Sequence, residues 1–171
     1  MTDIMTSEQR SRCMAAVKGK DTKPELIVRK YLFSRGLRYR VNNRKLPGSP
    51  DIVLKKYKTV VFIDGCFWHG HEDCKYFRLP KSNVKFWKEK IERNIERDAR
   101  NEADLKALGW RVIRVWECEI KTVSSRKDYL ESLYESIVKP TQSYAEESDF
   151  DSLSIAAEPD SEMTYEHRKD S

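Results

Sequence analysis

The sequence predicts a mixed α/β (α+β) domain built round one central sheet. Three observations lead to this class. The elements follow the order helix, strands, long helix, strand and helix; residues 60–63 form a continuously apolar strand; and residues 82–109 carry apolar positions at helical spacing. With 171 residues, the chain can form one domain with its own hydrophobic core.

The first clear helix is expected over residues 22–36, after a weaker helical pattern near residues 7–19. Thr22 can cap this helix with Glu25 three residues later, Pro24 lies in its first turn, and Gly36 ends it. Its buried side is expected to contain five large side chains: Leu26, Val28, Tyr31, Leu32 and Phe33.

Short strands are expected next, at residues 37–41, 51–57 and 58–64. The last two are joined so tightly that they predict a hairpin. The apolar run at residues 60–63 is typical of a central strand that is covered on both faces. Residues 65–82 show neither the helical nor the strand period of apolar residues. We therefore expect an irregular segment that needs contacts from outside itself to hold its conformation.

The long helix is expected to be capped by Ser82 or Asn83 and closed by Gly109. One face combines apolar with polar residues: Trp87, Ile91, Ile95 and Leu105 with Asn94, Asp98 and Glu102. Polar groups at inward positions need partners, so this face predicts polar contacts with the rest of the domain. A strand over residues 110–118 and a helix over 126–138 complete the domain.

Charge divides the chain at residue 140. Residues 1–139 hold 31 Lys and Arg against 19 Asp and Glu, whereas residues 140–171 hold 2 against 9. We therefore expect a folded domain over residues 1–139 and an acidic, disordered tail over 140–171. The basic domain suits a nucleic acid, although a solvated basic surface would look the same. No apolar run is long enough for a membrane span, and the N-terminus does not resemble a secretion signal.

Two acidic residues stand at corresponding ends of the predicted hairpin. Asp51 opens one strand and Asp64 closes the next, so pairing of the strands would bring them together. Two carboxylates there can share Mg²⁺, which supports phosphodiester hydrolysis. Glu25, His69 and Asp98 add acid–base groups. The alternative is that both aspartates serve only in turns.

The cysteines and histidines predict a metal site. Cys66, His71 and Cys74 lie within nine residues, and Cys118 ends a later strand. Three sulfurs and one nitrogen form a closed set typical of structural zinc. His69 or Asp73 could replace one of these ligands, and the cysteines could instead be small buried apolar residues. Cys13 lies far from the group and is expected to be a plain thiol.

Aromatic residues are the third signal. Phe67 and Trp68 lie between the metal ligands, and Trp87 begins the long helix, within a region dense in Lys and Arg. Such side chains can wedge between base pairs and kink a duplex. At Trp87 the alternative is ordinary core packing, because this residue lies on the inward face.

Together these residues resemble the very short patch repair endonuclease family, which nicks DNA at T:G mismatches. The resemblance covers about residues 7–138. It rests on RSRCMAAVKGKDTKPE, LPGSPDIV, VVFIDGCFWHGH, FWKEKIERNIERD and GWRVIRVWECE, in that order. It implies the fold of the PD-(D/E)xK restriction endonucleases, with one mixed sheet flanked by helices and a structural zinc site.

By position, the resemblance implies that Asp51 binds Mg²⁺ with help from the Ile63 carbonyl, that His69 and Glu25 belong to the catalytic site, and that Asp98 supports a histidine. It also implies a zinc set, Cys66, His71, Cys74 and Cys118. The resemblance further implies that five residues intercalate into DNA or contact the mismatch: Phe67, Trp68, Trp87, Met14 and Lys90.

The sequence departs from the family at three places. Asp64 stands where the best-known members have His, so we infer that it joins Asp51 as a second Mg²⁺ ligand. The second departure is one residue inserted between His71 and Cys74. Cys66 stands where the PD-(D/E)xK motif has Lys, which the family tolerates. The tail beyond about residue 140 has no counterpart.

The expected function is thus a Mg²⁺-dependent endonuclease that nicks one strand beside a T:G mismatch left by deamination of 5-methylcytosine. Expected partners are mismatched double-stranded DNA and other mismatch-repair proteins, for a cytoplasmic, nucleoid-associated monomer without membrane contact. One alternative is a restriction-like or damage-directed nuclease of the same fold. The other is a zinc-stabilised DNA-binding module without catalysis, which would not need Asp51, Asp64 and His69.

Overall fold

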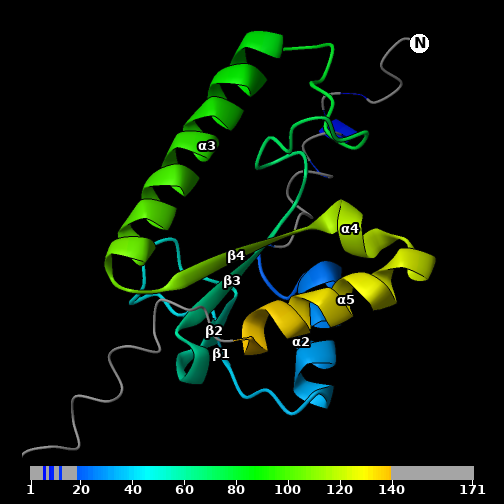
Figure 1. The fold of residues 1–171 in the computed structure, drawn as a ribbon. Helices are drawn as coiled ribbons and strands as arrows, with labels where there is room; N and C mark the ends of the chain where they lie inside the picture. The colour runs from blue at the N-terminus through cyan, green and yellow to red at the C-terminus, as the bar shows by residue number, and fades with distance from the viewer. Residues whose placement is uncertain (1–5, 7, 10–11, 13–18, 140–171) are drawn as a thin grey trace, which may run out of the picture. The chain divides into compact units, whose positions relative to one another are not determined.

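The computed structural model describes residues 6, 8–9, 12 and 19–139, and Figure 1 traces its elements. A four-stranded mixed sheet has the order β1 (Arg40–Val41), β2 (Ile52–Leu54), β3 (Thr59–Asp64) and β4 (Arg111–Trp116). The strand pairs β1–β2 and β2–β3 are antiparallel, and β3–β4 is parallel. The predicted mixed α/β class and the β2–β3 hairpin are therefore confirmed.

Helices cover both faces of this sheet. The element order also contains α2 (Lys23–Ser34), the 3₁₀ turn η1 (Lys55–Tyr57), α3 (Val84–Ala107), α4 (Glu117–Lys121) and α5 (Val123–Val138). The main core joins α2, α4 and α5 to one face, where Val61 and Ile63 of β3 point. A smaller core joins Leu105 of α3 to Val60 on the other face. Strand alternation therefore directs Asp64, like Val60, toward the side of α3.

The start of α2 follows the predicted signals. Thr22 and Glu25 form a reciprocal capping box, and proline lies in the first turn. The expectation for its buried side is wrong at two residues, because Leu26 is 42% exposed and Phe33 is 55% exposed. Glu25 and Arg29 are buried instead, where they form an ion pair with each other at 2.7 Å.

The long helix α3 also departs from expectation at its start and on its inward face. Asn83 precedes it in a left-handed conformation (φ 51°) and makes no side-chain capping bond. Ile91 and Leu105 are buried as predicted, but Ile95 is 44% exposed. A Cβ atom on Gly70 would lie 2.7 Å from Ile95 Cδ1, so the irregular segment packs closely on α3 there.

Other boundaries differ from the sequence-based expectation. The strand expected over residues 37–41 shortens to Arg40–Val41. Cys118 lies in the first turn of α4 rather than in a strand, and α5 begins three residues before the predicted residue 126. The helix expected near residues 7–19 lies largely outside the described residues, as do Cys13, Met14 and the acidic segment 140–171, so the domain boundary at 139 stays a prediction. Within the described part of the chain, every helix is too short or too polar to cross a membrane.

Candidate active site and cysteine–histidine cluster

Asp51 and Asp64 meet at one end of the β2–β3 hairpin. Ile52 pairs with Val61, which places Asp51 beside the end of β3. There Asp51 Oδ2 accepts a hydrogen bond of 2.7 Å from the Ile63 backbone N–H. Burial raises the pKa of Asp51 to about 6, and the nearby charges of Glu25 and Asp64 act in the same direction. The predicted pair of carboxylates is thus brought together.

Asp64 is buried between an arginine and a histidine. Arg114 of β4 donates to Asp64 Oδ2, and His69 Nε2 lies 3.6 Å from Asp64 Oδ1. Burial raises the pKa of Asp64, although the contacts with His69 and Arg114 oppose this effect. Arg114 reaches Asp64 because parallel pairing sets it beside Phe62, two residues earlier on the same face of β3.

His69 is held by the inward face of α3. Its Nδ1 atom lies 2.5 Å from Asp98 Oδ2, and because a carboxylate accepts hydrogen bonds, this contact places a proton on Nδ1. Burial alone would raise the pKa of Asp98, but the hydrogen bonds from His69 and Arg97 bring it below its ordinary value. The other polar residues of this face also have partners: Asn94 donates to the Trp68 carbonyl, and Glu102 lies 3.6 Å from Arg114.

A cleft of about 1210 Å³ is lined by Glu25, Asp51, Asp64 and His69. Its carboxylates differ in their partners. Glu25 pairs with Arg29 at 2.7 Å, and Asp64 pairs with Arg114. Over the described residues, the structure gives Asp51 no ion pair, and its bond to Ile63 comes from a neutral backbone group. Asp51 is therefore a buried carboxylate of this cleft that makes no ion pair with the described residues, and its negative charge favours a bound cation.

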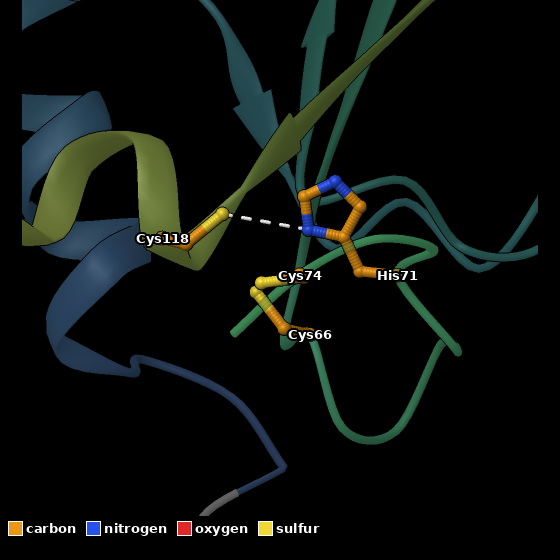
Figure 2. Close-up of side chains that lie close together, drawn as sticks. All are labelled: Cys66, His71, Cys74 and Cys118. Atoms are coloured by element: carbon orange, nitrogen blue, oxygen red, sulfur yellow. Dashed lines mark hydrogen bonds between the residues drawn. The ribbon is translucent and has the colours of Figure 1, made fainter. Parts of the chain in front are cut away.

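Four further side chains gather at the ends of β3 and β4, as Figure 2 shows. Cys66 follows β3 by two residues and Cys118 follows β4 by two, and parallel pairing of Asp64 with Trp116 puts both at one sheet edge. His71 and Cys74 join them from the irregular segment. The ligand atoms all lie within 4.8 Å of one another, and Cys118 Sγ lies 3.4 Å from His71 Nδ1. The predicted set of four is thus brought together, and His69 and Asp73 are not in it.

The chemistry of this cluster suits a soft divalent cation. Burial raises the pKa of Cys118 to about 12, and its contacts with Cys66 and Cys74 add to the shift. Burial also raises the pKa of Cys66, whereas hydrogen bonds lower the pKa of Cys74 in spite of burial. A buried thiol resists ionisation unless a cation compensates the charge. In a tetrahedral zinc site the ligand atoms lie about 3.8 Å apart, which this cluster reaches with small adjustments.

The predicted aromatic residues form one cluster beside the cleft. The ring centroids of Phe67, Trp68 and Trp87 lie 5.2–6.0 Å apart in edge-to-face arrangements. Lys90 Nζ lies 5.6 Å from the Trp68 ring and 5.9 Å from the Trp87 ring. Sequence reasoning missed Phe86, which is 51% exposed and packs on Trp87 at 5.3 Å.

Two residues of β4 also escaped the sequence analysis. Arg114 binds Asp64, and the Trp116 ring stacks on His71 with centroids 4.0 Å apart. Strand alternation puts residues 112, 114 and 116 on one face, but only the parallel register of β4 with β3 shows that this face also carries Asp64. Met14 lies outside the described residues, so its predicted contact stays a prediction.

Known proteins resemble this chain over most of its length. The family profile described as "DNA mismatch endonuclease Vsr" matches residues 2–76. A type II nicking enzyme of Neisseria meningitidis serogroup A is 53% identical over 137 residues, covering 80% of this chain and 97% of that protein. A type II nicking enzyme of Xanthomonas oryzae is 45% identical, covering 82% of this chain and 100% of that protein. The DNA mismatch endonuclease Vsr of Escherichia coli is 43% identical, covering 71% of this chain and 77% of that protein.

The chain belongs to the Vsr family of DNA mismatch endonucleases. The resemblance stated from the sequence motifs is confirmed, as is the prediction of a DNA endonuclease. In this Vsr-family chain, Trp68 lines the cleft, and the neighbouring Phe67 lines a smaller cavity with Cys66 and Cys118.

Proposed function

We propose that this Vsr-family endonuclease is Mg²⁺-dependent and nicks one DNA strand beside a T:G mismatch that arises from deamination of 5-methylcytosine. The observation that carries the proposal is Asp51, a carboxylate that makes no ion pair with the described residues, in one cleft with Asp64 and His69. The strand-end carboxylates also support a PD-(D/E)xK core. The names of the relatives, nicking enzymes and a mismatch endonuclease, agree with a single-strand cut.

The donor set fits Mg²⁺. Asp51 Oδ2 accepts a hydrogen bond from the Ile63 N–H, which leaves Oδ1 available to a metal ion. Asp64 Oδ2 accepts from Arg114, and its other oxygen, Oδ1, lies 3.6 Å from His69 Nε2. Hard carboxylate oxygens are the ligands that Mg²⁺ takes, and the Ile63 carbonyl is the proposed further ligand. When bound, Mg²⁺ polarises a phosphoryl oxygen and lowers the pKa of its water.

His69 is proposed to transfer a proton. Asp98 fixes a proton on Nδ1, so Nε2 is the nitrogen that exchanges a proton with the reacting groups. Glu25 is proposed to act through its charge beside Asp51, since its own oxygens are engaged by Arg29 and Thr22.

The aromatic cluster is proposed to open the duplex. Inserting a ring between base pairs costs a few kcal/mol of stacking energy per base step, and the opened step makes the mismatch accessible. Phe67, Trp68 and Trp87 supply the rings, while Lys90 and Met14 are proposed to contact the mismatched bases. Structural zinc on Cys66, His71, Cys74 and Cys118 is proposed to hold the irregular segment that carries Phe67 and Trp68, because four protein ligands close the metal's coordination.

Several finer expectations remain proposals. They are a monomeric enzyme, contact with other mismatch-repair proteins, a cytoplasmic and nucleoid-associated location, and a separate acidic tail over residues 140–171. The tail's composition, with 9 acidic against 2 basic residues, supports the boundary at residue 139.

The proposed function is tested with end-labelled duplexes that contain one T:G pair, or T:A at the same place, with Mg²⁺ or with EDTA. We expect one nick beside the mismatch, in the T:G duplex with Mg²⁺ only. Cleavage of the T:A duplex at a fixed sequence would point to a restriction-like nuclease. Tight binding of either duplex without cleavage would point to a DNA-binding module.

The pKa of Asp51 predicts how Mg²⁺ stabilises the protein at different pH. Because the pKa is raised from 3.8 to about 6 in the folded state, the ionised carboxylate costs stability above pH 6, and this cost fades as the pH falls toward 4. Mg²⁺ binds the ionised form, so its increase of the melting temperature should be larger at pH 8 than at pH 5. Thermal scans with and without Mg²⁺ measure this increase of the melting temperature. In Asp51→Asn, the increase should no longer differ between the two pH values. An equal increase at both pH values would contradict the assignment.

Replacing Trp68 by alanine should weaken binding to mismatched DNA. Base–aromatic stacking is worth about 1–3 kcal/mol, so we expect the Kd of the T:G duplex to rise about 10- to 100-fold. Fluorescence anisotropy measures the change. The matched control is Phe33→Ala, which removes an exposed ring on α2 that does not belong to the aromatic cluster. Equal Kd values for both variants would remove Trp68 from DNA recognition.

A further inference from the structure

Arg114 differs from the other arginines that pair with the acidic residues of the site. Arg29 lies on the same helix as Glu25, and Arg97 is the sequence neighbour of Asp98. Arg114 instead comes from β4 and lies 50 residues from Asp64 in the sequence. Its contact with Asp64 therefore exists only because β3 and β4 pair in parallel with Phe62 beside Arg114.

Strand β3 itself supplies no cation to the site. The PD-(D/E)xK pattern expects Lys two residues after the second carboxylate, and Cys66 stands there. Cys66 is buried, and its sulfur belongs to the cysteine–histidine cluster. Any positive side chain that serves Asp64 must therefore come from another element.

Among the described residues, Asp64 accepts the hydrogen bond that the Arg114 guanidinium donates, so further N–H groups of this side chain are left for other acceptors. One terminal nitrogen binds Asp64 Oδ2, and the other forms an ion pair with Glu102 Oε2 at 3.6 Å, which is longer than a normal hydrogen bond. A guanidinium carries five N–H donors in a planar fork. Arg114 also lines a second cavity, of about 320 Å³, that Asp64 and His69 share. Its remaining donors therefore lie beside both the acidic and the imidazole group of the site.

We propose that Arg114 is a positioning residue that supplies, from β4, the cationic role that the nuclease motif assigns to a lysine on β3. Its bond to Oδ2 fixes Asp64 with Oδ1 toward His69, and its charge lies next to the place where the phosphate reacts. The inference rests on the proposed function, since it assigns Arg114 to that same site.

The test compares single-turnover nicking of the T:G duplex by the full-length wild-type protein, Arg114→Leu and Arg114→Lys, each across a Mg²⁺ titration. Lys106→Leu is the matched control, because Lys106 binds Glu102 at 2.8 Å but is not in contact with Asp64. Loss of a positioned charge at a reacting centre costs about 10²- to 10³-fold in rate. We expect that loss in Arg114→Leu, with a higher half-saturating Mg²⁺ concentration and a Kd for DNA within about threefold of wild type.

Arg114→Lys should recover about tenfold of the lost rate, because lysine restores the charge but not the fork. Lys106→Leu should nick at the wild-type rate. Wild-type nicking by Arg114→Leu would overturn the inference alone. A rate loss in Arg114→Leu that lysine does not rescue, with an unchanged Mg²⁺ titration, would also overturn it, because packing alone would then explain the loss. If the wild-type protein does not nick the duplex, the proposed function fails and the inference falls with it.

Discussion

Replacing Asp51 by asparagine should abolish nicking of mismatched DNA. The amide has nearly the same shape, and its oxygen can still accept the bond from Ile63 N–H, so the fold should persist. The substitution removes the negative charge of Asp51, which makes no ion pair within the described residues. Stabilisation of the transition state by a bound cation is worth several kcal/mol, so the rate should fall about 10³-fold or more. Single-turnover kinetics on the T:G duplex measure this loss.

The matched control is Asp104→Asn, which removes an exposed carboxylate from the same protein, on α3 and away from the cleft lining. It should nick at the wild-type rate, and both variants should bind the T:G duplex with nearly unchanged Kd. An active Asp51→Asn variant would remove Asp51 from the mechanism. An inactive variant that has also lost its cooperative thermal transition would show a structural role in its place.

Replacing Cys118 by serine should release zinc and unfold residues 65–80. This segment lacks helices and strands, and Cys118 supplies the ligand that ties it to α4. Structural zinc contributes an apparent free energy of about 10–16 kcal/mol in small zinc domains, so the loss of one ligand removes a large part of what holds the segment. Metal analysis and hydrogen exchange of the backbone amides measure the two effects.

Cys13→Ser is the matched control for this experiment, because Cys13 lies outside the group of four in the sequence. It should keep one zinc per chain and unchanged exchange at residues 65–80. Full zinc content in Cys118→Ser would contradict the ligand assignment. Wild-type protein purified without any divalent metal, yet with residues 65–80 protected, would contradict the structural role of the metal.

Much of the fold followed from local sequence signals. The capping box of Thr22 and Glu25 set the start of α2, and the apolar run in β3 predicted a strand that is covered on both faces. The failures occurred where tertiary contacts override local preference. Phe33 has the spacing of a buried residue, but at this position α2 faces solvent, and its ring lies under the Arg38 guanidinium.

The candidate site was predictable where strand pairing alone decides proximity. Asp51 and Asp64 could be placed together from a hairpin. The inward polar face of α3 predicted only that Asp98 has a partner, and the family resemblance implied that this partner is a histidine. Arg114 was not predictable, because its contact depends on the parallel register of β3 with β4, and no local pattern specifies that register. Phe86 was missed for a similar reason, since only the three-dimensional cluster shows its ring on Trp87.

Asp51 and Asp64 are proposed to hold the cation of the nicking reaction together. Crystals of the wild-type protein soaked in Mn²⁺, which takes the same oxygen ligands as Mg²⁺, test it directly through anomalous scattering. We expect an anomalous peak about 2.2 Å from an oxygen of Asp51, with Asp64 beside it. Crystals of Asp51→Asn should lack this peak. A manganese peak elsewhere in the protein, with Asp51 free of it, would contradict the account.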